Sequence, residues 1–165
     1  MPRVAFDRLP RNARLWIFSA ERELTDSEGS RLLEEVDVFI DQWTAHGVQL
    51  TAGRDWQYSR FLFVGVDEAA AGVSGCSIDS LVRRMKVLQE MLGAELVNQA
   101  AVFFRTGSMI ERVSRERFAE LANSGMVTTN TAVFDNTLTK VGDIYAGRWE
   151  VSVSESWHAK AFFDE

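Results

Sequence analysis

The sequence predicts an α+β protein whose first part, residues 1–105, is a ferredoxin-like core with the element order β-α-β-β-α-β. Two continuous apolar runs, 15–18 and 61–66, are typical of strands buried on both faces. A stretch with apolar residues at helical spacing follows each of these runs. In the ferredoxin-like fold the first and third strands are central, and the two apolar runs fall on the first and third predicted strands.

The first helix is expected over about residues 26–46. Thr25 and Glu28 have the spacing of a capping box at its start. Gly47 is expected to end it. The apolar residues between them lie on one helical stripe, which comprises Leu32, Leu33, Val36, Phe39, Ile40 and Trp43.

The second strand, expected over 48–56, alternates only in part, as suits a more polar edge strand. After the third strand, a loop rich in glycine and serine leads to a second helix that Gly93 should end. Residues 101–104 are expected to form the fourth strand of the core. The apolar stripe of the second helix comprises Ile78, Leu81, Met85, Leu88 and Leu92.

Residues 106–165 are expected to form a C-terminal α/β extension that packs on the core. Thr106-Gly107-Ser108 is typical of a hairpin turn, and Ser114 can cap a short helix that ends at Gly125. A strand over 131–134 and a short helix over about 138–145 should follow. The tail is too aromatic to be disordered.

Composition and charge exclude several classes of protein. The chain has 165 residues and a net charge of −6, which argues against a general nucleic-acid binder. The basic cluster Arg83, Arg84 and Lys86 is expected to be a solvated face. One cysteine cannot form an internal disulfide, and neither a signal peptide nor an apolar run of about 20 residues occurs, so we expect a cytoplasmic protein. Neither phosphate-binding glycine motif nor a metal-ligand spacing is present, so we expect no cofactor and no metal.

The only cysteine, Cys76, lies where the sequence looks most like a site. If Ser77 caps the second helix, Cys76 lies just outside it, where the helix dipole would stabilise a thiolate. A nucleophilic cysteine needs a base, and His158 in the tail is the better candidate, because His46 is explained by the end of the first helix. The negative charge of Asp79 would oppose the thiolate. The alternative is that Cys76 is a small buried residue.

The same loop offers a second hypothesis. Backbone N–H groups from Gly72 through Gly75 to Ser77 could bind a small anion, with Asp79 as a further candidate residue. The alternative is that the glycines only permit a tight turn. Trp157, together with Trp149, could line a groove for a ligand or peptide, although core roles are commoner for such residues.

Two acidic residues, Asp67 and Glu68, end the third predicted strand. Carboxylates at such a position can bind metal or act as bases. Strand-end carboxylates are more often solvated.

Three segments together resemble an uncharacterised family of small bacterial proteins, chiefly of Bacteroidetes type. They are 42–47, 75–80, and 148–150 with 155–159. The resemblance spans nearly the whole chain and implies a bacterial protein. Members of that family are sometimes labelled ABC transporter ATPase automatically, but this sequence lacks the phosphate-binding lysine loop of such enzymes.

Residues 109–149 also resemble a GYF-type adaptor pattern. Ile110 and Val113 precede a short helix, and the segments 124–127 and 133–134 then lead to Trp149. The resemblance implies binding of a peptide or protein partner.

The sequence therefore predicts a non-enzymatic binding or interaction module. A homodimer is expected by analogy with other ferredoxin-like sheets, which associate through faces or edges. Two alternatives stay open. One is a thiol-dependent enzyme that uses Cys76 with His158, and the other is a small-anion binder at the 72–77 loop.

Overall fold

The computed structural model describes residues 3–164 of the chain. It divides into two compact units, Met1–Asn98 with Thr139–Gly142 and Gln99–Leu138 with Asp143–Glu165. Each unit contains helices and a sheet, which confirms the α+β class. Within residues 3–164, no helix combines the length and the apolar character that a membrane crossing requires.

The main sheet of the first unit has three antiparallel strands in the order β1-β5-β4. Their bounds are β1 Arg14–Ser19, β4 Thr51–Gln57 and β5 Phe61–Asp67. In the central strand β5, Gly65 pairs with Leu15 on one side and with Gly53 on the other. Residues 61–66 of β5 are all buried, which explains the continuous apolar run and confirms that the third predicted strand is central. The prediction that the first strand is also central is wrong, because β1 is an end strand of this three-stranded sheet.

The fourth predicted strand belongs to a different sheet. Residues 101–104 contribute to β6 (Val102–Thr106), which pairs with β7 and β8 in the second unit. The four-stranded ferredoxin-like sheet is therefore not confirmed. Beside β1 lie residues 139–141 instead, where the Leu15 N–H donates to the Thr139 carbonyl and the Val141 N–H donates to the Ala13 carbonyl, both at 2.9 Å. An apolar run specifies a strand but not the edge on which it pairs.

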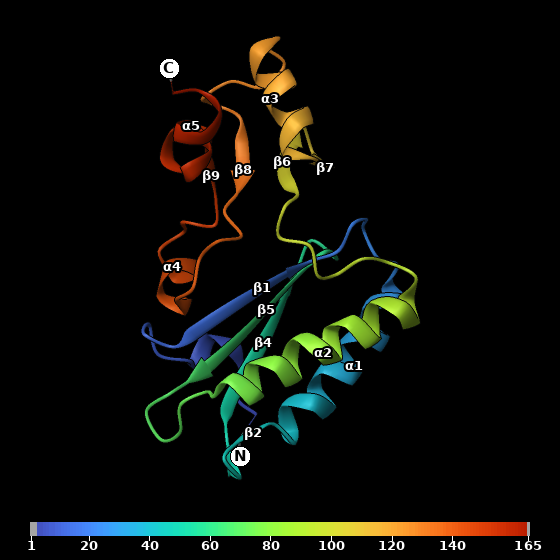
Figure 1. Cartoon of the computed structure of the whole chain (residues 1–165), viewed down its shortest axis with the longest axis vertical. Coiled ribbons are helices and arrows are strands. Elements are labelled where there is room, and N and C mark those ends of the chain that lie inside the picture. The colour runs from blue at the N-terminus through green and yellow to red at the C-terminus, as the bar shows by residue number, and fades with distance from the viewer. Residues whose placement is uncertain (1–2, 165) are drawn as a thin grey trace. The chain divides into compact units, whose positions relative to one another are not determined.

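Helices α1 (Asp26–Asp41) and α2 (Gly75–Leu92) lie side by side against one face of this sheet (Figure 1). The capping box of Thr25 and Glu28 is present as predicted. Both apolar stripes face the same core, together with strand residues from β1, β4 and β5. The helix residues buried in this apolar core are Leu32, Val36, Ile40, Leu81, Met85 and Leu88.

Helix α1 ends at Asp41, so the prediction that it continues to about residue 46 is wrong. The next residues form a hairpin of two short strands, β2 Thr44–Ala45 and β3 Val48–Gln49. His46 and Gly47 make its turn with φ angles of 52° and 78°. Two successive residues with positive φ suit a tight hairpin turn and cannot continue a helix. Gly47 thus serves the hairpin turn rather than the helix end, and the prediction that His46 lies at the end of the first helix is wrong for the same reason.

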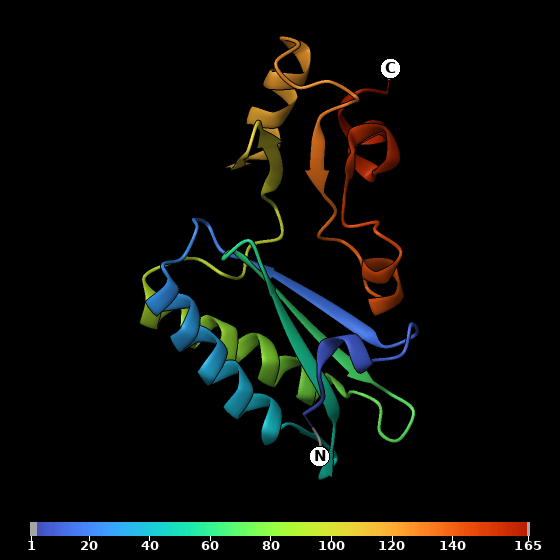
Figure 2. The ribbon, with the colours of Figure 1, turned by 180° about the vertical axis from the view of Figure 1, so that it is seen from behind.

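The opposite face of the sheet is covered by the N-terminal segment, which includes the short helix η1 (Phe6–Arg8) (Figure 2). The Val4 N–H donates to the Ala52 carbonyl at 2.8 Å, so this segment also borders the outer edge of β4. Phe6 and Leu9 are buried and lie over Gly65. Both edges of the three-stranded sheet are therefore bordered by other parts of the first unit, which protects edge strands from unwanted pairing.

The second unit contains a sheet of four strands in the order β7-β6-β8-β9. Its further strands are β7 Met109–Val113, β8 Ala132–Phe134 and β9 Glu150–Ser152. Ser114 caps helix α3 (Arg115–Asn123) as predicted. Its other helices are η2 Val153–Glu155 and α5 Trp157–Phe162, while α4 Val141–Tyr145 begins with two residues of the first unit and ends in the second. The core of this unit comprises Val102, Phe104, Phe118, Val127, Val133 and Val153.

We expect Gly53→Ala to destabilise the first unit. An added Cβ would lie 2.5 Å from the Val4 carbonyl oxygen, so the N-terminal segment would have to move. Overpacking of this kind costs about 1–3 kcal/mol in the free energy of unfolding, which urea titration measures. Gly75→Ala is the matched control, because nothing lies within 4 Å of its added Cβ. Equal stabilities of the two variants would contradict the prediction.

Candidate functional site

The N-terminus of α2 is capped by Ser74, so the prediction that Ser77 is the cap is wrong. The Ser77 N–H donates to Ser74 Oγ at 3.1 Å, and the Ser74 N–H donates to Ser77 Oγ at 2.6 Å. Serine suits both the cap and the third helical position, and the two residues have the required spacing. Cys76 therefore lies inside the first helical turn rather than before it.

The 72–77 loop uses much of its hydrogen-bonding capacity internally. Besides the two serine N–H groups, the Val73 N–H donates to Glu68 Oε2 at 3.0 Å. The Glu68 carboxylate therefore lies beside the loop. An anion bound there would either displace it from the Val73 N–H or be repelled by its negative charge. Neither Gly72 nor Gly75 has a positive φ, so the alternative that the glycines permit a tight turn gains no support. Anion binding at the loop stays a prediction.

The acidic residues around the loop have ordinary structural surroundings. Asp67 accepts a hydrogen bond from the Ala69 N–H at 3.0 Å, and Asp79 is exposed in the first part of α2. Across residues 3–164, no group of three or more His, Cys, Asp or Glu side chains is placed to hold a metal ion.

Cys76 and His158 belong to different units. Cys76 is exposed, so the alternative that it is a small buried residue is wrong. His158 is only 1% exposed and lies in the core of the second unit. Its Nδ1 contacts Ser156 Oγ, and its ring stacks on Trp157 with 4.0 Å between centroids. These contacts give His158 a packing role within its own unit. The Cys76–His158 pair stays a prediction.

Burial lowers the pKa of His158 to about 4. The negative charge of Asp135 opposes this shift, and the positive charge of Arg115 adds to it. His158 is therefore neutral at neutral pH. A neutral imidazole fits its place against the rings of Trp157 and Phe118.

Both tryptophans of the predicted groove pack inside the second unit. Trp149 is buried, its indole N–H donates to Asn136 Oδ1 at 2.8 Å, and its ring lies 4.9 Å from that of Phe134. Trp157 is half-buried, with the Arg115 guanidinium 5.1 Å from its ring centroid. Its buried Nε1 finds no hydrogen-bond partner among residues 3–164. The contacts are those of core residues.

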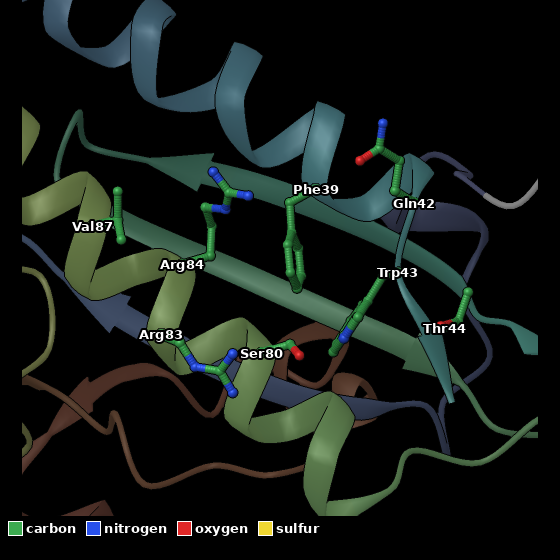
Figure 3. Close-up of a pocket in the computed structure, with 8 residues that line it drawn as sticks. All are labelled: Phe39, Gln42, Trp43, Thr44, Ser80, Arg83, Arg84 and Val87. Atoms are coloured by element: carbon green, nitrogen blue, oxygen red, sulfur yellow. The ribbon is translucent and has the colours of Figure 1, made fainter. Parts of the chain in front are cut away.

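A pocket of about 420 Å³ opens between the C-terminal end of α1 and the middle of α2 (Figure 3). Figure 3 shows the Phe39 ring reaching from α1 toward α2, with the Arg84 side chain on one side of it and Trp43 on the other. A pocket of this size suits a small ligand. Its lining residues are Phe39, Gln42, Trp43, Thr44, Ser80, Arg83, Arg84 and Val87.

The floor of this α1–α2 pocket is held by Trp43. Its indole N–H donates to the Ser77 carbonyl at 2.9 Å, and the ring is only 2% exposed. This hydrogen bond joins segment 42–47 to segment 75–80, two of the three segments that carried the family resemblance. Ser80 is tied to the same turn, because its Oγ donates to the Cys76 carbonyl at 3.0 Å.

The two arginines of the pocket are exposed and form no ion pair with any residue in the described range 3–164. The prediction of a solvated basic face describes their exposure but missed the pocket. The sequence shows that Arg83 and Arg84 are neighbours along the chain, but not that they share a pocket with residues of α1. The sequence predicts core positions for Phe39 and Trp43, because their spacing is that of the apolar stripe of the first helix.

Comparisons with family models, curated proteins and solved structures give no match to this chain. Both family resemblances therefore stay predictions.

We expect Trp43→Phe to destabilise the first unit more than Trp16→Phe. The first substitution removes the indole bond to the Ser77 carbonyl, which still accepts the helical bond within α2, so the loss is that of one buried hydrogen bond, about 0.5–1.5 kcal/mol. Trp16 also packs against the core, but its indole N–H makes no hydrogen bond to any residue in 3–164. Urea unfolding of both variants gives the comparison. An equal loss of stability would show that the hydrogen bond contributes little.

We expect the second unit to lose stability as the pH falls from 6.5 toward about 4. Because the folded-state pKa of His158 is lowered from 6.5 to about 4, the unfolded chain binds the proton over this window and the folded chain does not. The contribution is fully present above pH 6.5. Urea unfolding at several pH values, followed by amide signals of β6 and β8, measures it.

His158→Phe is the control, because it keeps a ring against Phe118 and Phe162 and removes the titration. The variant should lose less stability than the native chain over the same pH range. Identical pH profiles would show that burial does not suppress protonation of His158.

Proposed function

We propose that the protein is a non-enzymatic binding module whose ligand site is the α1–α2 pocket. The observation that carries the proposal is the combination of an aromatic floor with two unpaired arginines in one pocket. A few polar groups placed around an apolar cavity are the usual composition of a small-ligand site.

The pocket is pre-organised. The Phe39 and Trp43 rings contact each other with 5.2 Å between centroids, and Trp43 meets Trp16 edge-on at 5.9 Å. The hydrogen bond to Ser77 fixes the indole further. A floor that is already rigid lowers the entropy lost on binding.

The lining supports binding rather than catalysis. The eight residues around the pocket include no histidine, cysteine or carboxylate that would act as a general base or nucleophile. Of its hydroxyl groups, that of Ser80 already donates to the Cys76 carbonyl. Arginine stays protonated and acts as a binding cation.

We also propose that the protein works in the cytoplasm. Cys76 is exposed and free. An exposed free thiol is maintained most readily in a reducing compartment.

The proposal is tested by titrating the ¹⁵N-labelled chain with small anionic, cationic and neutral fragments. We expect at least one class to shift the Trp43 indole signal and the Ser80 and Val87 amides in a saturable way, because these groups surround the pocket. Cys76→Ser is the control and should bind equally well, since Cys76 does not line the pocket.

Two outcomes would contradict the proposal. If no fragment class shifts the pocket signals at millimolar concentration, the pocket is not a ligand site. If Cys76→Ser abolishes binding, the thiol-dependent alternative is favoured instead.

A further inference from the structure

We infer that the ligand of the α1–α2 pocket is a small organic acid, with an apolar body and a carboxylate as its charged group. The inference rests on the proposed function and names the chemical class that the site selects.

The charge of the site selects an anion. Arg83 and Arg84 line the pocket and have no carboxylate partner among residues 3–164. Some arginines of the first unit do have one, such as Arg54 with Asp37 at 2.9 Å and Arg22 with Glu28 at 2.8 Å, and others, such as Arg31, have none within the same range; Arg83 and Arg84 differ from those in lining a pocket. The chain as a whole carries a net charge of −6, so two adjacent unpaired cations in a pocket run against its general charge. Guanidinium groups bind carboxylates through paired hydrogen bonds.

The floor of the site selects an apolar body. Trp43 is only 2% exposed and has used its only donor on the Ser77 carbonyl, so it supports the pocket without presenting a hydrogen-bonding group to a ligand. Phe39 offers a ring face, and Val87 is 55% exposed at the other end of the lining. A small inorganic anion would leave this apolar surface in water, whereas a ligand with a hydrocarbon body would cover it.

The helices around the site favour a carboxylate over a phosphate. Phosphate sites commonly use backbone N–H groups at a helix N-terminus. Phe39 lies in the last turn of α1 and Gln42 follows its end, so this pocket meets the negative end of the α1 dipole. From α2 come Ser80, Arg83, Arg84 and Val87, all beyond the first turn. A singly charged group is therefore better suited to this position than a doubly charged one.

The experiment uses two probes with the same ring system and different charge, naphthalene-2-carboxylate and 2-naphthylmethanol. Titration of the full chain, followed by the Trp43 indole signal, gives a dissociation constant for each. We expect the carboxylate to bind at least about tenfold more tightly, as one charge-assisted hydrogen-bonded pair implies. The double substitution Arg83→Gln with Arg84→Gln should abolish this preference. The affinity of 2-naphthylmethanol should be the same for the double variant and for the native chain.

Lys86→Gln is the matched control. It removes one exposed positive charge from α2 at a residue that does not line the pocket. The preference for the carboxylate should persist in this variant. If Lys86→Gln reduces the preference as much as the arginine double variant does, the general charge of α2 and not the pocket selects the anion, and the inference fails.

Three other results would overturn the inference. They are equal binding of the two naphthalene probes, a preference that survives in the arginine double variant, and a 2-naphthyl phosphate that binds more than about tenfold better than the carboxylate. In each case the proposed function stands, because the pocket still binds a ligand. If none of the probes and none of the fragments in the broader panel binds, both the proposed function and this inference are wrong.

Discussion

The hydrogen bond from the Trp43 indole to the Ser77 carbonyl holds together the elements that form the α1–α2 pocket. Trp43 stands between the end of α1 and the β2-β3 hairpin, and Ser77 lies in the first turn of α2. Because Trp43 is buried, the bond is favoured over leaving the indole N–H unpaired. It links the chain just after α1 to the first turn of α2, beside the place where Phe39 and the arginines of α2 line the pocket.

The start of α2 shows how structural needs can produce a sequence that looks like a reactive site. Ser74 and Ser77 satisfy each other's N–H groups, and Glu68 accepts from the Val73 N–H in the same loop. These bonds account for most of the polar residues around Cys76 without a ligand. His158, the proposed partner of Cys76, is accounted for in the second unit by its ring contacts and by the neutral state that its burial favours.

Local patterns predicted those features that neighbouring residues decide. The capping box of Thr25 and Glu28, the Ser114 cap and the buried run of β5 all depend on short spacings, and all are present. Two predictions failed where local signals were ambiguous. The spacing of Trp43 fits the α1 stripe, yet the positive φ angles of His46 and Gly47 place these residues in a hairpin. Ser77 suits a cap, yet Ser74 takes that position.

By itself, the sequence determined the α+β class, the two long helices with their buried stripes, and the central place of β5, because side-chain periodicity and capping act over a few residues. Only the tertiary structure decided that residues 101–104 pair in the second unit while 139–141 border β1. It also decided that Phe39 and Trp43 meet Arg83 and Arg84 around one pocket. Both are choices between distant segments, and they depend on which surfaces pack together. The spacing of residues along one helix carries no information about the residues on another helix that will face them.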